Sequence, residues 1–318
     1  MRHKVLIVGL GKIALGFDLS GNEDEVFSHT KAFLNNDAFE LIGGVDGEKN
    51  RRDEFEAFSG KKAFATLDEA FDYCGFVDVI SICTPTHVRL PVFLDILKFK
   101  PRLVIIEKPI SSSVEEALEI KNIADANKIK LYINYMRRVE PCFAELKKRL
   151  FDAGDVSNIV VHYTNGLFTN ASHFINLMLF FFKKPSSIMV LDIQKTNSDY
   201  AADFIMKYDG FSVYFATHKN IDYSLGEVDI ICNNRRYCIY DWGFNVKFFE
   251  SAKDPLFPEL KALKETDDFE YPQMNVYMKH VAGHIKKMLL CEYEYGDVED
   301  AIATTEICEY IKNASLSI

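Results

Sequence analysis

The sequence predicts an α/β protein of two parts: a doubly wound parallel sheet, then an α+β domain with an open, largely antiparallel sheet. In roughly the first 135 residues, short β-rich runs alternate with helical stretches, which is typical of βαβ units. After that point strand-like runs follow one another directly, and the alternation of residues 211–218 favours antiparallel strands with one solvated or interface face. We expect the domains to be 1–137 and 138–318.

Each predicted strand of the first part is a β-rich run followed by a turn or a helical stretch. These strands are 4–8, 39–45, 63–64, 77–82, 103–107 and 131–134. Helices should fill the gaps between them. The clearest helix starts after Ser113, where Glu115 and Glu116 complete the spacing of a capping box, and it ends near residue 127.

The second part is predicted to be rich in strands, with helices near 140–151 and 172–182. Its strands are 158–163, 187–195, 202–208, 212–218, 227–232, 237–240 and 245–249, followed by helices 272–290 and 298–313. The apolar run 174–182 contains Asn176 and is far shorter than the ~20 residues of a membrane helix. We therefore interpret it as a buried helix.

Composition limits the classes of partner. The chain has 318 residues, 48% of them hydrophobic, and a formal charge of −10 with dispersed acids. This argues against nucleic acid or an anionic membrane as the main partner, but it does not exclude an anionic small molecule in a basic pocket. Seven cysteines, an odd number without C-x-x-C, and the lack of a secretory signal favour reduced thiols in a cytoplasmic protein.

The run after the first strand has the pattern G-x-G-x-x-A. Gly9 permits a tight turn, Gly11 lets the backbone approach a pyrophosphate, and Ala14 lets a helix pack closely on the strand. The N-terminus of that helix would then face the phosphates, with Lys12 and Ile13 in its first turn. This is the fingerprint of a dinucleotide-binding Rossmann domain.

An acid closes the second strand. Asp46 follows the apolar run 39–45, where a carboxylate can bind the two hydroxyls of an adenosine ribose and would repel a 2′-phosphate. The cofactor is therefore expected to be NAD rather than NADP, although Arg51 and Arg52 are near enough to leave dual use open.

Asp46 lies farther from the glycines than the usual spacing of about 20 residues. The surplus is an insertion at 16–27, after which the helical signal resumes at Ser28. Two interpretations stay open: a solvated acidic loop, or a flap over the cofactor or substrate.

Polar residues follow three further predicted strands. Because the carboxyl ends of parallel strands meet at one edge of a sheet, we expect these residues to gather at the edge that holds the pyrophosphate. They are Thr84, Pro85 and His87 after the fourth strand, Glu107 and Lys108 after the fifth, and Asn134, Tyr135, Arg137 and Arg138 after the sixth.

The sequence resembles the glucose-fructose oxidoreductase / inositol dehydrogenase / rhizopine catabolism (Gfo/Idh/MocA) oxidoreductase family in four motifs. These are the dinucleotide fingerprint, Thr-Pro after the fourth strand, Glu-Lys-Pro after the fifth, and Asn-Tyr-Met-Arg-Arg after the sixth. The likeness spans nearly the whole chain. It implies a Rossmann domain followed by an α+β domain whose exposed sheet face joins subunits into a homodimer or homotetramer. It also implies hydride transfer between a sugar or cyclitol carbinol carbon and the nicotinamide.

The resemblance also implies site residues. Lys108 matches the family lysine that touches the reacting hydroxyl, and His173 matches a second acid/base, with Asn176 three residues beyond. The family's first aspartate is absent: Thr169 stands in its place, with Asn170 beside it. We expect cofactor contacts from Gly9, Gly11, Lys12, Ile13, Asp46, Thr84, Pro85, His87 and Glu107, and substrate contacts from Lys108, Asn134, Tyr135, Arg137, Asn170, His173 and Asn176.

Some roles are left open. Arg89 stands where many relatives carry a histidine, and either Arg89 or His87 could contact the cofactor or cap the following helix. One of Arg137 and Arg138 should hold a sugar hydroxyl or a phosphate, and the other should form an interdomain ion pair.

No metal site is predicted. His280 and His284 have the spacing of a zinc helix, but Val281 replaces the glutamate that should follow the first histidine.

The sequence thus predicts an NAD-dependent dehydrogenase of a free sugar, an inositol or a nucleotide-linked sugar of surface polysaccharide synthesis. Two alternatives remain: a glycosidase that uses bound NAD for transient oxidation, without net NADH, and a non-enzymatic NAD-binding regulator.

Overall fold

The computed structural model describes residues 2–153, 156–266, 271–291 and 297–314. The chain forms two compact units, Met1–Val139 with Asn275–Ile302 and Glu140–Met274 with Ala303–Ile318. The expected boundary at residues 137 and 138 lies close to the first of these divisions, but the return of 275–302 to the first unit was not expected. Backbone pairing explains this return, because the amide of Val26 donates to the carbonyl of Asn275 at 2.9 Å.

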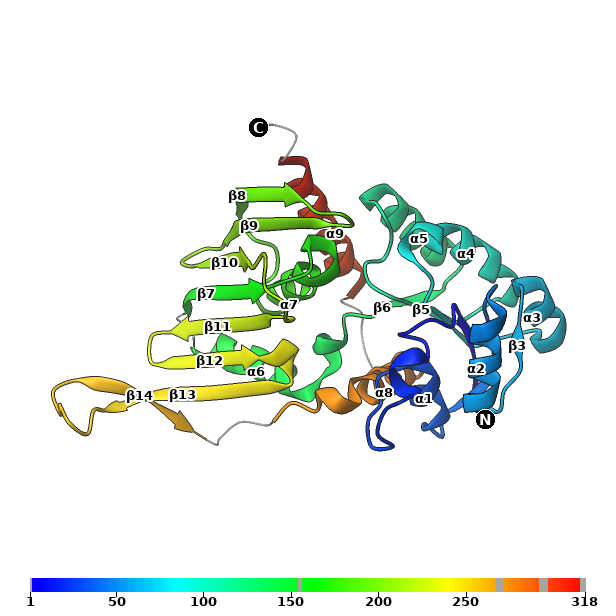
Figure 1. Cartoon of the computed structure of the whole chain (residues 1–318), viewed down its shortest axis with the longest axis horizontal. Helices are drawn as coiled ribbons and strands as arrows, with labels where there is room; N and C mark the ends of the chain where they lie inside the picture. The colour runs from blue at the N-terminus through cyan, green and yellow to red at the C-terminus, as the bar shows by residue number, and fades with distance from the viewer. Residues whose placement is uncertain (1, 154–155, 267–270, 292–296, 315–318) are drawn as a thin grey trace. The chain divides into compact units, whose positions relative to one another are not determined.

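The first unit contains a parallel sheet of strand order β3-β2-β1-β4-β5-β6 (Figure 1), which confirms the predicted doubly wound fold. Every residue of β4 and β5 is buried, as expected for strands covered on both faces. The strands are β1 (His3–Val8), β2 (Phe39–Val45), β3 (Ala63–Phe64), β4 (Val79–Ile82), β5 (Leu103–Ile106) and β6 (Lys130–Ile133).

The helices of this unit are α1 (His29–Leu34), α2 (Lys49–Ser59), α3 (Leu67–Cys74), α4 (Arg89–Asp95), α5 (Val114–Ala126) and α8 (Tyr277–Leu289). The predicted cap of α5 is confirmed: the hydroxyl of Ser113 accepts the amide of Glu116 at 3.2 Å. The carboxylate of Glu116 in turn accepts the amide of Ser112 at 3.1 Å.

The segment after the glycines differs from the prediction. No helix forms directly after Gly11, where one was expected, and this stretch contains turns and a single 3-10 turn at Gly16–Asp18. The cause is Asp18, whose buried carboxylate accepts the amides of Phe27 and Ser28, the latter at 2.8 Å. The insertion is thereby closed into a loop. As predicted, helical structure resumes after Ser28, where α1 begins.

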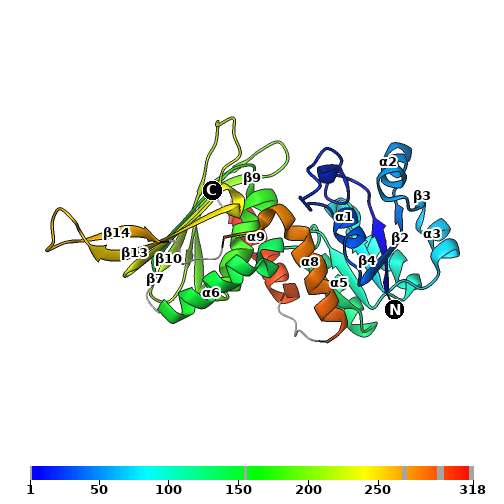
Figure 2. The same ribbon diagram turned by 90° about the horizontal axis from the view of Figure 1, so that it is seen from below.

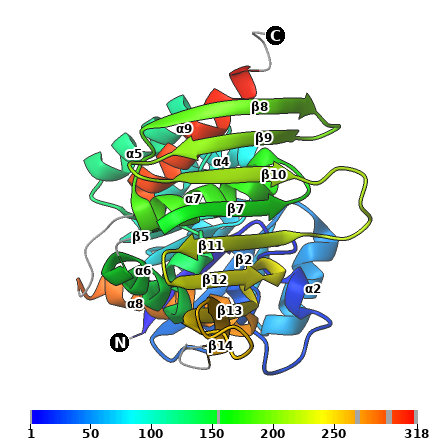
Figure 3. The same ribbon diagram turned by 90° about the vertical axis from the view of Figure 1, so that its left-hand side faces the viewer.

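The second unit contains a sheet of strand order β14-β13-β12-β11-β7-β10-β9-β8, seen face-on in Figure 3. Only β7 and β10 pair in parallel, so the largely antiparallel sheet is confirmed. The strands are β7 (Val156–Tyr163), β8 (Ser187–Lys195), β9 (Tyr200–Lys207), β10 (Ser212–Thr217), β11 (Gly226–Cys232), β12 (Arg235–Tyr240), β13 (Asn245–Lys253) and β14 (Lys261–Thr266). The sequence did not predict β14, which is highly charged and mostly exposed.

Helices cover one face of this sheet (Figure 2). They are α6 (Pro141–Ala153), α7 (Ser172–Phe182) and the last part of α9 (Asp297–Ala314). Most of α7 is buried, as predicted for this apolar run. Several apolar side chains of the sheet remain exposed, among them Met189, Leu191 and Tyr214. In the part of the chain that the structure describes, we find no helix with the length and apolar character needed to cross a membrane.

Candidate functional site

A cavity of about 680 Å³ lies at the carboxyl ends of β1, β2 and β4. Gly9 and Gly11 border it in different ways. Gly9 has φ +87°, and a Cβ there would lie 2.9 Å from the backbone of Cys83 and Thr84, so only glycine fits. At Gly11, no atom lies within 4 Å of the place a Cβ would take. The backbone at Gly11 is therefore open to a ligand.

This cavity suits a dinucleotide. The amides of Gly11, Lys12 and Ile13 have no acceptor within the described residues, and together they can donate to a pyrophosphate. The buried hydroxyl of Thr84 also faces no partner within the described chain. The lining comprises Val8, Gly9, Gly11, Lys12, Ile13, Phe17, Val45, Asp46, Gly47, Arg51, Ala65, Thr66, Leu67, Cys83, Thr84, Pro85 and Val92.

Asp46 is held in one orientation at the end of β2. Its carboxylate accepts the amides of Leu10 at 2.8 Å and Glu48 at 2.9 Å. The guanidinium of Arg51, half-exposed at the cavity, lies 3.4 Å from the same carboxylate. Arg52 instead donates to two backbone carbonyls of the turn, both at 2.8 Å. Of the two arginines, Arg51 is thus the one that borders the cavity.

Only some of the cofactor contacts predicted on the loop after β4 lie at the cavity. Thr84 and Pro85 line the cavity, whereas His87 is exposed on the 3-10 turn Thr86–Val88 and is not part of the lining. Arg89 is buried and donates to the carbonyls of Thr84, Glu107 and Pro109. Arg89 therefore fastens the loop after β4 to the loop after β5.

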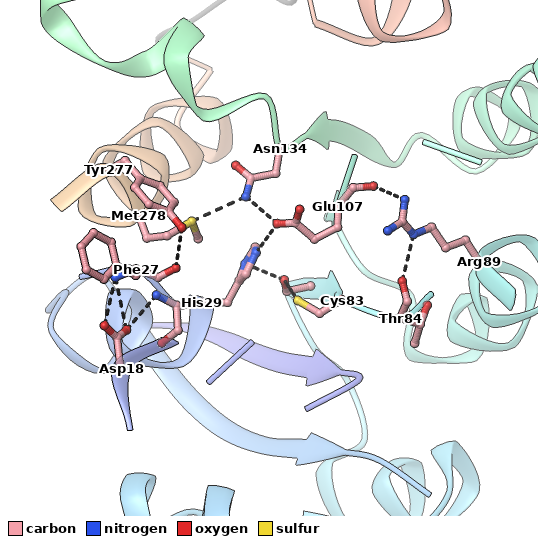
Figure 4. A network of polar contacts seen from close by, with 12 residues as sticks. Asp18, Phe27, His29, Cys83, Thr84, Arg89, Glu107, Asn134, Tyr277 and Met278 are labelled. Atoms are coloured by element: carbon pink, nitrogen blue, oxygen red, sulfur yellow. Dashed lines mark hydrogen bonds and ion pairs between the residues drawn. The ribbon is translucent and has the colours of Figure 1, made fainter. Parts of the chain in front are cut away.

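A buried polar network connects the ends of these strands (Figure 4). His29 donates or accepts on both ring nitrogens, with Nε2 2.8 Å from Glu107 Oε1 and Nδ1 2.8 Å from Ser81 Oγ. Asn134 Nδ2 donates to the same Glu107 oxygen at 2.6 Å. The Ser81 hydroxyl lies 3.5 Å from the sulfur of Cys83, which lines the cavity.

This network carries charge. Burial alone would lower the pKa of His29, but Cys83 and Glu107 outweigh it and raise that pKa to about 10. Burial alone would raise the pKa of Glu107, but the bonds from His29 and Asn134 hold it below its ordinary value. Glu107 is thus a carboxylate committed to a buried ion pair, next to Lys108 in the chain.

The other predicted residues of the first unit lie in two environments. Lys108 is half-buried, while Tyr135 and Arg137 are buried, and burial lowers the pKa of Arg137 to about 10. Asn134 Oδ1 is buried and unpaired among the described residues. Arg138 forms an ion pair with Asp300 of the same unit at 2.8 Å, so this pair is not the interdomain pair expected of one of the two arginines.

The second unit presents the remaining predicted residues at the start of α7. A wide π turn, Leu167–Ala171, precedes α7 and contains Asn170. The side-chain Nδ2 of Asn170 donates to the carbonyl of Thr164 at 2.7 Å. His173 is half-buried in the first turn of α7. Asn176 is buried and donates to the hydroxyl of Thr304 at 3.0 Å, so this amide binds within the unit.

The sequence did not predict a role for His29 or Asp199, and both are buried groups with several polar partners. A histidine at the start of the resumed helical signal was visible in the sequence. Nothing in the sequence indicated that Asp199 contacts residues 168–169.

The insertion at 16–27 is anchored at its two ends. Beyond the bonds to Asp18, Tyr277 Oη donates to the carbonyl of Phe27 at 2.9 Å. Phe17, half-exposed, lines the cavity. These contacts fix the two ends of the insertion, whereas residues 19–24 between them are exposed, so both interpretations stay open. In the described part of the chain, no three His, Cys, Asp or Glu side chains are grouped to hold a metal ion.

The class of protein is defined by the parallel sheet, the loop of Gly9 and Gly11, and the carboxylate of Asp46. Together they are typical of a dinucleotide-binding protein of the Rossmann type. Residues 3–135 match a model described as an oxidoreductase family with an NAD-binding Rossmann fold. This part of the chain therefore matches the NAD-binding portion of the Gfo/Idh/MocA oxidoreductases, the family that the motifs resemble.

Solved structures share the fold over the whole chain. A dehydrogenase (MviM) from Clostridium difficile is 17% identical with a TM-score of 0.78, covering 99% of this chain and 100% of that chain. UDP-N-acetylglucosamine 3-dehydrogenase GnnA from Acidithiobacillus ferrooxidans is 16% identical, with a TM-score of 0.74 over 99% and 98%. An Agrobacterium radiobacter oxidoreductase in complex with NAD+, L-tartaric acid and magnesium is 13% identical, with a TM-score of 0.74 over 99% and 97%. No curated protein matches the chain in sequence.

Proposed function

We propose that this protein is an NAD-dependent dehydrogenase that oxidises a carbinol carbon of a sugar or nucleotide-linked sugar, or reduces the corresponding ketone. The observation that carries this proposal is the convergence at one sheet edge. The open backbone at Gly11 and the oriented Asp46 border one cavity, and Arg89 ties the loop beside it to the loop that carries Lys108. NAD, when bound, supplies the hydride acceptor.

Lys108 and His173 manage the proton in this proposal. A half-buried lysine can donate a hydrogen bond to the substrate oxygen and relay its proton. A histidine titrates near neutral pH, so His173 can take up or return that proton in either direction of the reaction. The buried pair of His29 and Glu107 fixes the strand end from which Lys108 projects.

Asp46 supports NAD over NADP. A carboxylate held by two amides is suited to accept two ribose hydroxyls, and a 2′-phosphate would meet its negative charge. The neighbouring Arg51 is the residue through which some NADPH binding would arise.

The proposal extends to the oligomeric state, the cellular compartment and the substrate class. Exposed Met189, Leu191 and Tyr214 on the second sheet support a homodimer or homotetramer formed through this sheet. The seven cysteines, none of which forms a disulfide within the described residues, support a cytoplasmic protein. A nucleotide-linked sugar is the first substrate class to test, because one protein of similar fold is a UDP-N-acetylglucosamine dehydrogenase.

Fluorescence titration of the purified protein with NADH and NADPH tests the cofactor assignment, and turnover of nucleotide-sugars and free sugars with NAD tests the reaction. We expect NADH to bind more tightly than NADPH and net NADH to form with one sugar class. Glycoside cleavage without net NADH would favour the NAD-dependent glycosidase. If Lys108→Ala kept both its ligand binding and its cellular function, a non-enzymatic regulator would be favoured. If the unmodified protein bound neither NADH nor NADPH, the proposal would be overturned.

A further inference from the structure

Asp199 is a buried carboxylate of the second unit, just before β9, that binds the start of the His173 helix. Its side chain accepts the amides of Phe168 at 3.1 Å and Thr169 at 2.8 Å, and the Thr169 hydroxyl at 2.8 Å. It also accepts the amide of Tyr200 at 2.7 Å. Asp199 is 8% exposed, so these bonds replace water almost completely.

The chain is shaped to bring this carboxylate close. Gly166 has φ +105°, and a Cβ at this position would lie 2.3 Å from Asp199 Oδ2. A side chain at residue 166 would therefore expel the carboxylate or move the helix start. The hydroxyl of Thr196 holds the other side of the loop by accepting the amide of Asp199 at 3.0 Å.

The bonds converge on the turn that precedes His173. Free amides at the start of a helix favour a negative group, and Asp199 satisfies those of Phe168 and Thr169 within the π turn. Thr169 lies in this π turn, and Ser172, the first residue of α7, donates its hydroxyl to the carbonyl of Phe168 at 2.7 Å, which couples the turn to the helix. A shift of Thr169 would therefore move the first turn of α7 and the imidazole with it.

We propose that Asp199 is a positioning residue for the acid/base His173, supplying from a distant loop a carboxylate that Thr169 itself lacks. This inference rests on the proposed dehydrogenase function. Asp199 holds the π turn in place through Thr169 and so sets where His173 is presented. The role is one of orientation, and Asp199 itself takes no proton in the reaction.

The test compares Asp199→Asn with Asp203→Asn. Asp203 lies on β9, and its carboxylate accepts the backbone amide of Thr217 at 2.7 Å. Asp203→Asn is therefore a control for replacing a carboxylate that accepts a backbone amide in the same unit. We expect Asp199→Asn to lower kcat about tenfold to a hundredfold, since small displacements of a catalytic group have effects of this size. KM and NADH affinity should change by less than about threefold, because binding is not the step affected.

Asp203→Asn should keep the kcat of the unmodified protein. If Asp199→Asn also kept it, or if both variants lost kcat in proportion to a common loss of thermal stability, the positioning role would be overturned. Thr169→Val, which removes the hydroxyl bond to Asp199 and keeps the backbone amide bond, replaces Asp199→Asn if that variant does not fold. It should lower kcat in the same way, and unchanged turnover would count against the inference.

A second readout separates this inference from the proposed function. If the unmodified protein turned over no sugar, the proposed function would fail, and hydrogen exchange would still test the role of Asp199. The amides of Phe168 and Thr169 should exchange at least about tenfold faster in Asp199→Asn than in the unmodified protein, because their acceptor is weakened. Unchanged exchange of these two amides would overturn the inference.

Discussion

Asp46 and Asp199 do similar structural work in the two units, yet only Asp46 could be recognised from the sequence. Each is a buried carboxylate that accepts at least two backbone amides, one or more of them from a segment carrying predicted site residues. Both residues border a cavity, but Asp46 faces Arg51 there, whereas Asp199 takes the hydroxyl of Thr169. The bonds of Asp46 orient it in the dinucleotide cavity, while those of Asp199 hold the turn before α7.

The two units differ in how far short motifs predict which side chains lie together. In the first unit, ligand-facing residues directly follow strands, so a parallel sheet brings them together by its topology alone. In the second unit, the contact between residues 168–169 and Asp199 depends on how a loop between two antiparallel strands is folded. Local periodicity carries no information about that packing.

The largest expected effect separates chemistry from binding. Lys108→Met should lower kcat by about 10²- to 10⁴-fold, the usual contribution of a general acid or base, with NADH affinity retained. Steady-state kinetics and NADH titration measure the two quantities. Lys98→Met, at a lysine ion-paired with Asp68, is the control and should keep full turnover. Comparable turnover in both variants would remove Lys108 from the chemistry.

The next effect tests the close approach at Asp199. Gly166→Ala should lower the free energy of unfolding by about 3 kcal/mol, because the new Cβ meets the carboxylate and the φ angle is unfavourable. Gly283→Ala in α8 is the matched control: no atom lies within 4 Å of its Cβ position, and it should stabilise the protein by up to about 1 kcal/mol. Urea unfolding measures both. Equal stability in the two variants would contradict the described contact.

The third prediction compares the two glycines of the dinucleotide loop. Gly11→Ala should leave the stability unchanged and weaken NADH binding at least about tenfold, because its Cβ points into space that a pyrophosphate needs. Gly9→Ala should instead lower the free energy of unfolding by about 2 kcal/mol. Thermal unfolding and NADH titration distinguish the pair. Full NADH affinity in Gly11→Ala would argue against a phosphate at this backbone.

The fourth prediction is a pH dependence of stability from His29. Its pKa is raised to about 10 in the folded protein, so the folded state holds a proton that the unfolded chain releases at neutral pH. The stabilisation is complete below the ordinary pKa of about 6.5 and is lost as the pH rises through about 10. The free energy of unfolding should fall by at most about 1.4 kcal/mol per pH unit in this window.

Urea unfolding between neutral pH and pH 10 checks this slope, with His29→Gln as the comparison. The variant should show a flatter dependence over the same window. Parallel slopes in the two proteins would mean that His29 is not held protonated by Glu107 and Cys83.

Much of the fold followed from the sequence because buried parallel strands are continuous apolar runs, and the predicted strands of the first unit agree with the structure. Three features did not follow. The carboxylate of Asp18 closes the predicted insertion so that no helix begins directly at the glycines, the segment Asn275–Ile302 returns to the first unit, and β14 is a charged strand. Each depends on contacts between residues far apart in sequence or on an exposed pairing with no hydrophobic pattern.

The candidate site was predictable to the same extent. Gly9, Gly11, Asp46, Thr84 and Pro85 line one cavity, as their places after strands implied. His87 lies outside that lining, and Glu107 is engaged with His29 and Asn134, which only the packed structure could show. The roles of Lys108, His173 and the substrate-facing residues stay predictions.

The most direct measurement of the central claim is a deuterium-transfer experiment. The purified protein is incubated with NAD and nucleotide-sugars whose ring carbons are deuterated, and the reduced cofactor is examined by mass spectrometry. Our account predicts reduced cofactor that carries one deuterium from the sugar, and its loss in Lys108→Met. Bound NAD that never acquires deuterium from any sugar of the panel would contradict the assignment as a sugar dehydrogenase.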